Sequence, residues 1–218
     1  MKRLLILPLL ALASASCAPQ QPEEACLRIE VTNPTLSNVG LLVDRTTSYT
    51  AELDKHGRAT ITLPGVEYLY AQLVYGEQMR PLFIQRGDGA TARFDGLHFA
   101  ESLEVDGKNR AANDYLRTTT LSEGPSYDVA WEEFAQGLQK QCAGIVRLLE
   151  VRGLDSLCPD FARIERIRLR YAYAQPMLVY EMGHRMMTGD TTFRVGPALT
   201  DSVRKLVVVR EELADVPE

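Results

Sequence analysis

The chain has 218 residues with a net charge of −5 at pH 7, and 45% of its residues are apolar. This composition is that of a globular protein and not of a disordered one, and the length suffices for one large or two small domains. The acidic balance excludes a strong electrostatic attraction to phosphate backbones, so we expect no nucleic-acid partner.

The first 16 residues have the layout of a secretory signal peptide. Lys2 and Arg3 give a positive start, an apolar run follows over 4–13, and small residues precede position 17. The apolar run is too short to cross a bilayer, which takes about 20 residues. We therefore expect residues 1–16 to be removed as a signal peptide.

Cys17 directly follows the small residues Ala15 and Ser16, where a lipoprotein signal places its cysteine. The stretch is similar to a bacterial lipobox, although Ser14 stands where a bulky aliphatic residue is usual. We expect Cys17 to carry the acyl chains of a lipid anchor, since two or more chains hold a protein firmly at a membrane. The alternative is ordinary cleavage near Ala15, which leaves a free thiol. Residues 17–25 then form a flexible, polar tether.

Residues 26–107 predict an antiparallel β-domain. Apolar and polar residues alternate in short runs separated by turn signals, as in Leu27, Ile29 and Val31. About seven short strands of this kind are typical of a β-sandwich or an open barrel. A parallel sheet is not expected, because no helical crossover fits between the runs. The candidate strands after the first are 40–45, 50–54, 59–64, 67–76, 81–85, 90–95 and 102–106.

Residues 108–218 predict a helical spacer of three to four helices, which makes the fold class α+β. A first helix is expected near 109–120. Apolar residues then recur at steps of three or four from Tyr127 to Leu149, and Gly153 ends that second helix.

A further helix begins at Asp160, and Pro176 should kink it or start a new segment. A last helix is expected at about 200–214. Trp131 and Phe134 stand near the start of the longest apolar seam, so we expect them to join the helical half to the sheet.

Besides Cys17, the chain has three cysteines, Cys26, Cys142 and Cys158, and it has no CxxC motif. In an oxidising compartment, Cys142 and Cys158 are candidates for a disulfide. The alternative is that Cys142, which lies on an apolar helical face, is a small core residue.

No pattern of catalytic, cofactor-binding or metal-ligating residues stands out. His56, His98 and His184 lack a second ligand at metal spacing, and no nucleophile or phosphate-loop motif is present. We therefore expect no catalytic residue, no cofactor and no metal.

Two groups of side chains could contact a partner. Arg163, Arg166 and Arg170 share one helical stripe, which could meet an anionic group. The alternative is a solvated helix face partly neutralised by Glu165. The tyrosines of 67–76 could stack on a carbohydrate, or they could fill a sandwich core.

The stretch RPLFIQRGDGATARFDG (80–96) and the following ESLEVDGKNRAANDYL (101–116) resemble the N-terminal β-domain of lipoproteins of the TlpA-like thioredoxin group in Gram-negative bacteria. In that domain of unknown function, a strand and a glycine turn lead through a second strand to a corner that precedes a helix. Here the corner reads Val105, Gly107 and Asn109.

The resemblance covers about residues 26–120 by motif. It implies an exported lipoprotein in the cell envelope of a Gram-negative bacterium, on the periplasmic side of a membrane or at the outer-membrane surface. In the family, a thioredoxin-like domain with a CxxC disulfide-reductase site usually follows the helical spacer. No residue of this chain matches those cysteines, and the chain ends at Glu218, where that domain would begin.

Three functions follow as hypotheses. The first is a non-catalytic, lipid-anchored binding or scaffold module, associated with a thioredoxin-like disulfide reductase as a separate or downstream partner. The second is the truncated front end of a thiol–disulfide oxidoreductase. The third is a surface lipoprotein that binds a glycan or a peptide, for which tyrosines exposed on the sheet would be the evidence.

Overall fold

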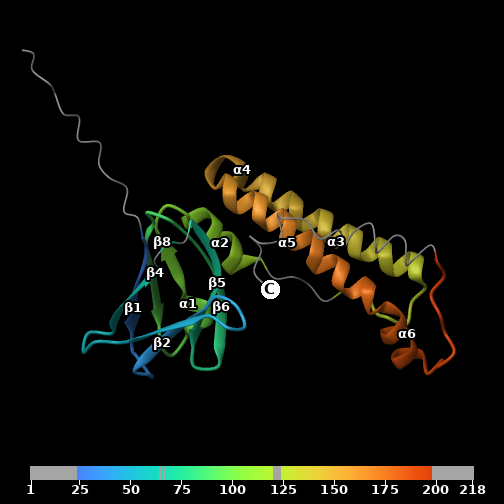
Figure 1. Cartoon of the computed structure of the whole chain (residues 1–218), viewed down its shortest axis with the longest axis horizontal. Helices are drawn as coiled ribbons and strands as arrows, with labels where there is room; N and C mark the ends of the chain where they lie inside the picture. Colours follow the sequence, from blue (N-terminus) through green and yellow to red (C-terminus); the bar gives the residue numbers. More distant parts are fainter. Residues whose placement is uncertain (1–23, 64, 66, 120–123, 198–218) are drawn as a thin grey trace, which may run out of the picture.

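The computed structural model describes residues 24–63, 65, 67–119 and 124–197, and Figure 1 shows a β-domain from whose side a long helical hairpin projects. The β-domain is formed by the strands and the two helices that precede residue 119, and two long helices, a third helix of nine residues and one short helical turn follow it. The elements are β1 (Ala25–Thr32), β2 (Asn38–Leu42), β3 (Ser48–Glu52), β4 (Arg58–Leu63), β5 (Tyr68–Tyr75), β6 (Gln78–Gln85), β7 (Gly89–Asp95), α1 (Phe99–Ser102), β8 (Glu104–Asp106), α2 (Arg110–Thr118), α3 (Trp131–Val151), α4 (Leu154–Leu157), α5 (Pro159–Leu178) and α6 (Tyr180–Thr188).

The strands form two four-stranded sheets that share one apolar core. The first sheet has the order β4-β1-β7-β8, and the second has the order β3-β2-β5-β6. Neighbouring strands are antiparallel in every pair except β1 and β7. This confirms the predicted α+β class, with a sandwich-like pair of sheets followed by helices.

The parallel pairing of β1 with β7 differs from the expectation of a purely antiparallel domain. Cys26 lies opposite Gly89, and the register continues to Thr32 opposite Asp95. Parallel neighbours need a long connection, which is usually a helix. Here the connection consists of five strands, β2 to β6, most of which build the other sheet. The chain therefore crosses over through strands, and a search for a helical crossover misses this route.

Alternation along the strands gives the sandwich its core. Leu27 and Ile29 of β1 are buried between the sheets, as the sequence predicted. Leu73 and Tyr75 of β5 face the same core, while Tyr70 points the other way, into a second apolar cluster formed with the helices. The second sheet is thus covered on both faces where β5 and β6 lie.

The corner that carries the family resemblance is a compact hydrogen-bonded turn. The carboxylate of Asp88 is buried and accepts the backbone N–H of Lys108 at 2.9 Å and the Asn109 side-chain amide at 3.1 Å. Gly107 has φ 142°, and a Cβ there would lie 2.6 Å from the Asp88 carboxylate. Glycine is therefore required at this position, because any side chain would displace the carboxylate that orients the start of α2.

Helix α2 closes the exposed edge of β6 through one side chain. Asn113 accepts the backbone N–H of Phe83 at 2.8 Å and donates to the carbonyl of Phe83 at 3.0 Å. The amide group thus replaces a neighbouring strand, and it satisfies buried backbone groups that would otherwise be costly.

Helices α3 and α5 form an antiparallel hairpin closed by the short helix α4 (Figure 1). Gly153 follows α3 with φ 65°, a left-handed conformation that suits glycine, and this confirms the predicted end of the helix. Helix α5 passes through Pro176 and ends at Leu178, and α6 starts at Tyr180. Pro176 therefore lies inside α5 and does not itself start a new segment, which begins four residues later. The helix expected at 200–214 lies outside the described residues.

The expectation that Trp131 and Phe134 join the helices to the sheet is wrong. Both lie at the start of α3, and their ring neighbours are Tyr127 and Tyr180, with ring centroids of Phe134 and Tyr180 4.8 Å apart. Figure 1 shows that α6 and the start of α3 lie at the end of the hairpin remote from the sheets. The seam begins far from the β-domain because α3 runs toward it, so the first residues of α3 pack against α6 instead.

The sheet and the helices meet at the opposite end of the hairpin. Phe161, near the start of α5, packs against Phe83 of β6, Tyr70 of β5 and Tyr115 of α2, with ring centroids 5.2, 6.2 and 5.6 Å away. Aromatic pairs in such geometry add about 0.5–1.5 kcal/mol beyond their buried area.

In the described ranges, no helix combines the length and apolarity needed to cross a membrane.

Candidate functional site

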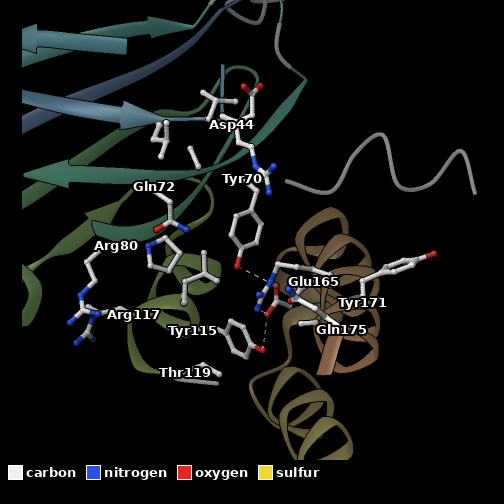
Figure 2. A pocket seen from close by; sticks show the side chains of 18 of the residues that line it. Asp44, Tyr70, Gln72, Arg80, Tyr115, Arg117, Thr119, Glu165, Tyr171 and Gln175 are labelled. Carbon is white, nitrogen blue, oxygen red and sulfur yellow. Dashed lines mark hydrogen bonds and ion pairs between the residues drawn. The ribbon is translucent and has the colours of Figure 1, made fainter. Parts of the chain in front are cut away.

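A cavity of about 820 Å³ opens where β5 and β6 meet α2 and α5. Figure 2 shows side chains that reach it from the sheet on one side and from the helices on the other. Pockets that bind small organic ligands have volumes of about 300–1,000 Å³, and such pockets are often found at the interface between two parts of a protein. The cavity is therefore the candidate functional site of the described part of the chain.

Glu165 of α5 lies at one side of the cavity and is fully buried. Its carboxylate accepts hydrogen bonds from the hydroxyls of Tyr70 at 3.3 Å and of Tyr115 at 3.2 Å. Arg168 donates two more, from Nε and Nη2, both at 2.7 Å. The carboxylate is thus charge-compensated by a two-point guanidinium contact and is hydrogen-bonded on both oxygens.

Local structure places these four groups together. The strand period turns Tyr70 away from the sandwich core, toward the helices. Tyr115 lies two residues after Asn113, which anchors α2 to β6. Glu165 and Arg168 are three residues apart on α5, a spacing that puts side chains on the same side of a helix.

The site shifts the ionisation of its members. Burial raises the pKa of Tyr70 well above its ordinary value, and the negative charge of Glu165 raises it further. The same two causes raise the pKa of Tyr115. For Arg168, burial is the largest single effect and lowers the pKa, but the hydrogen bonds to Glu165 together with the electrostatic interactions with Tyr70, Glu165 and Tyr115 outweigh it, and the pKa rises. Both hydroxyls therefore stay protonated as donors, and the guanidinium stays charged.

Two further arginines lie on the far side of the cavity from Glu165. Arg80 comes from β6 and Arg117 from the last turn of α2, and Figure 2 shows them next to each other. The Nε of Arg80 donates to the carbonyl of Ala100 at 3.3 Å. Arg117 lies 3.8 Å from the carboxylate of Asp114, which is also 3.8 Å from Arg110. Both arginines also line a small adjoining pocket, which supports their proximity.

Asp44 and Arg45 border the cavity from the loop after β2. The Asp44 carboxylate accepts backbone N–H groups of Thr46 and Thr47, each at 2.7 Å. These hydrogen bonds, that of Thr46 first, lower the pKa of Asp44 to about 2. Asp44 is therefore ionised at neutral pH, and its carboxylate is hydrogen-bonded to backbone groups of its own turn.

The arginine stripe predicted on α5 has specific partners. Arg166 makes a two-point contact with Asp155, with distances of 2.6 and 2.8 Å. Arg163 donates to the hydroxyl of Tyr68 at 3.3 Å. The suggestion that Glu165 neutralises a solvated face is wrong, because Glu165 is buried at the junction with the β-domain and pairs with Arg168.

Cys26, Cys142 and Cys158 are free thiols in the structure. Burial raises the pKa of both Cys142 and Cys158, so a smaller fraction of each thiol is ionised to the reactive thiolate at neutral pH. Cys142 lies nine residues before the end of α3, about 14 Å along the helix at 1.5 Å per residue, whereas Cys158 directly precedes α5 at the end of the hairpin closed by α4. A disulfide needs Cα atoms within about 7 Å, so the predicted bridge between Cys142 and Cys158 is not compatible with this arrangement.

The other residues singled out from the sequence lie apart from the cavity. His56 is in the turn before β4, His98 precedes α1, and the Nδ1 of His184 lies 2.7 Å from the carbonyl of Tyr127. Within the described ranges, no three histidine, cysteine or acidic side chains are grouped as metal ligands. Cys17 lies outside the described residues.

The tyrosines of β5 do not form a solvent-facing platform. Tyr75 is buried in the sandwich core, and Tyr70 is buried under α5. Tyr68 is partly buried and stacks on Phe83. The hypothesis that a carbohydrate stacks on this face of the sheet required solvent-exposed tyrosines. The buried and partly buried tyrosines of β5 do not meet that requirement.

The sequence did not single out Arg168, Arg80 or Arg117. A usable signal existed for Arg168, because Phe161, Glu165 and Arg168 follow each other at steps of four and three. An acid and a base in that series can lie on an apolar seam as a pair. Arg80 and Arg117 come from different elements, so only the fold brings them together.

The comparisons with known proteins add no relative: no protein-family model, no curated protein and no solved structure matches the chain.

Proposed function

We propose that this chain is a non-catalytic, lipid-anchored binding module of the cell envelope of a Gram-negative bacterium. The observation that carries the binding function is the cavity of about 820 Å³ between the sheet and α5. Its wall combines a fixed polar cluster with apolar surface, which is the usual composition of a ligand pocket. The anchor rests on Cys17 and the signal-like residues before it.

The state of the polar groups supports binding over catalysis. A general acid or base needs a proton that it can exchange near neutral pH. In the cavity, the pKa values of Tyr70, Tyr115 and Arg168 are all raised away from that range. Burial also raises the pKa values of the Cys142 and Cys158 thiols, which disfavours these two cysteines as nucleophiles. Association with a thioredoxin-like reductase remains part of the proposal and rests on the family resemblance.

The test is to purify the native protein from membranes and to measure its intact mass and its bound small molecules. We expect a mass that has lost residues 1–16 and gained acyl chains on Cys17. Cys17→Ala should appear in the soluble fraction. A soluble, unacylated native protein would overturn the anchor.

The binding half of the proposal uses the same preparation. Native mass spectrometry should detect a small molecule that leaves the protein on denaturation. Ala172→Trp, which fills the cavity from α5, should abolish this co-purification. The matched control is Ala143→Trp on the exposed side of α3, which should retain the molecule. Equal retention by both variants would contradict a role for the cavity.

A further inference from the structure

We propose that the cavity binds a small amphipathic anion, with its carboxylate or phosphate held by Arg80 and Arg117 and its apolar body lying along the cavity wall. This inference rests on the proposed function, because it takes the cavity to be the binding site. It adds the chemical class of the ligand and the end of the cavity at which the charged group lies.

Two guanidinium groups converge at one end of the cavity. Arg80 and Arg117 come from different elements and border the same two hollows. Their partners are weak, since Arg80 contacts a carbonyl and Arg117 lies 3.8 Å from a carboxylate that Arg110 also approaches. Guanidinium forks match the geometry of carboxylate and phosphate groups, so a bound anion would complete this arrangement.

The side chains around the cavity carry more positive than negative charge. Among the described residues, four arginines and two acids line it: Arg45, Arg80, Arg117, Arg168, Asp44 and Glu165. Glu165 neutralises Arg168 through two hydrogen bonds of 2.7 Å. Asp44 is held by N–H groups of its own turn. The cavity is therefore locally positive on a chain whose net charge is −5, which favours an anion at this site over other parts of the surface.

Apolar side chains form another part of the cavity wall. Leu42 and Val43 reach the cavity from the end of β2, and Leu116, Ala172 and Leu178 reach it from the helices. Leu178 is 59% exposed although it borders the cavity. A ligand with an apolar body would cover such surface and remove it from water, which favours binding.

The polar cluster around Glu165 lies at the other end of the cavity and is a poor place for the charged group of the ligand. The two hydroxyls and the guanidinium of Arg168 all donate to the same carboxylate. Because these donors are already used, an anion gains little there and would meet the negative charge of Glu165. The arginine pair is thus the favoured place for the charged group.

The experiment is calorimetric titration of the full chain carrying Cys17→Ala, which avoids detergent. The probes are decanoate, decyl phosphate and the neutral decanol. We expect both anions to bind more tightly than decanol, and the tighter of the two identifies a carboxylate or a phosphate source. Arg80→Gln and Arg117→Gln should each weaken anion binding about tenfold, as the loss of a charge-assisted hydrogen bond does, and should leave decanol unaffected.

Arg86→Gln is the matched control, since Arg86 directly follows β6, the strand that carries Arg80, is exposed, and lines neither the cavity nor the small adjoining pocket. It should bind all probes like the parent protein. Decanol binding as tightly as the anions, or Arg80→Gln and Arg117→Gln that bind the anions normally, would overturn the inference while leaving the cavity as a binding site. Failure of all three probes would also overturn it, and the co-purification experiment would decide the proposed function separately.

Discussion

Glu165 is the residue on which the junction between the β-domain and the helices depends. It is fully buried, and its partners come from β5, α2 and its own helix α5. A buried carboxylate is expensive unless it is paired and fully hydrogen-bonded. Tyr70, Tyr115 and Arg168 meet that condition together, so removing any one partner affects elements that are distant in sequence.

We predict that Glu165→Gln lowers the free energy of unfolding by about 3–5 kcal/mol, because the partly buried Arg168 loses a fully buried counter-charge. Urea unfolding of the full chain measures the change. The double variant Glu165→Met with Arg168→Met should recover most of the loss, since a buried ion pair can be replaced by apolar groups of similar volume. A loss below about 1 kcal/mol for Glu165→Gln would mean that the pair is solvated.

At the scale of elements, the α3–α5 hairpin has two distinct ends. One end packs on the β-domain through Phe161, and the other is closed by an aromatic cluster that includes Phe134, Tyr180 and Phe193. Tyr180 also donates to the carbonyl of Val129 at 2.7 Å, which ties α6 to the chain before α3. The distal cluster therefore stabilises the hairpin without touching the sheets.

We predict that Phe134→Ala costs about 3–5 kcal/mol, as truncation of a fully buried aromatic residue does. Hydrogen exchange should rise in α6 and in the first turns of α3, and it should rise little in β1 and β7. Leu148→Ala, at a position that is 38% exposed on the same helix, is the control and should cost under about 1 kcal/mol. Equal loss of protection in the sheets would show that the distal cluster does support the β-domain.

Local patterns predicted the elements but not their non-local contacts. Alternation in β1 and the glycine at 153 each depend on nearby residues, and both predictions are confirmed. The pairing of β1 with β7 joins segments about sixty residues apart, and no local period reports it. The cavity is similar, because Arg80 and Arg117 belong to elements that only the fold brings together. Glu165 was misjudged because its polarity suggested solvent, whereas its partners lie on other elements.

At the scale of the whole molecule, carboxylates in turns hold successive segments in place. Asp44, Asp54, Asp95 and Asp190 each accept backbone N–H groups within their own turn. These hydrogen bonds lower the pKa of Asp44, Asp54 and Asp95, to about 2 for Asp44, and for Asp190 the side-chain hydroxyl of Thr192 lowers the pKa more than the backbone groups do. The turns lie in both halves of the chain, so acid should weaken both halves together.

We predict that stability is constant from neutral pH down to about pH 4 and falls between pH 4 and pH 2. A carboxylate with a depressed folded-state pKa stabilises the fold above its unfolded pKa of about 3.9. That contribution is lost as the pH falls through the folded-state pKa. Urea midpoints measured across this range test the prediction. The double variant Asp54→Asn with Asp95→Asn should show a shallower decline, and an unchanged slope would contradict the role of these turns.

The place of β1 in its sheet decides how the molecule responds to a mechanical load. β1 is an inner strand, bound by β4 on one side and by β7 on the other, and it begins at Ala25. Tension applied through the preceding segment acts along β1 and loads its hydrogen bonds to both neighbours at once, in shear. The domain should therefore resist extraction from this end far better than a fold whose first strand lies at an edge and opens one bond at a time.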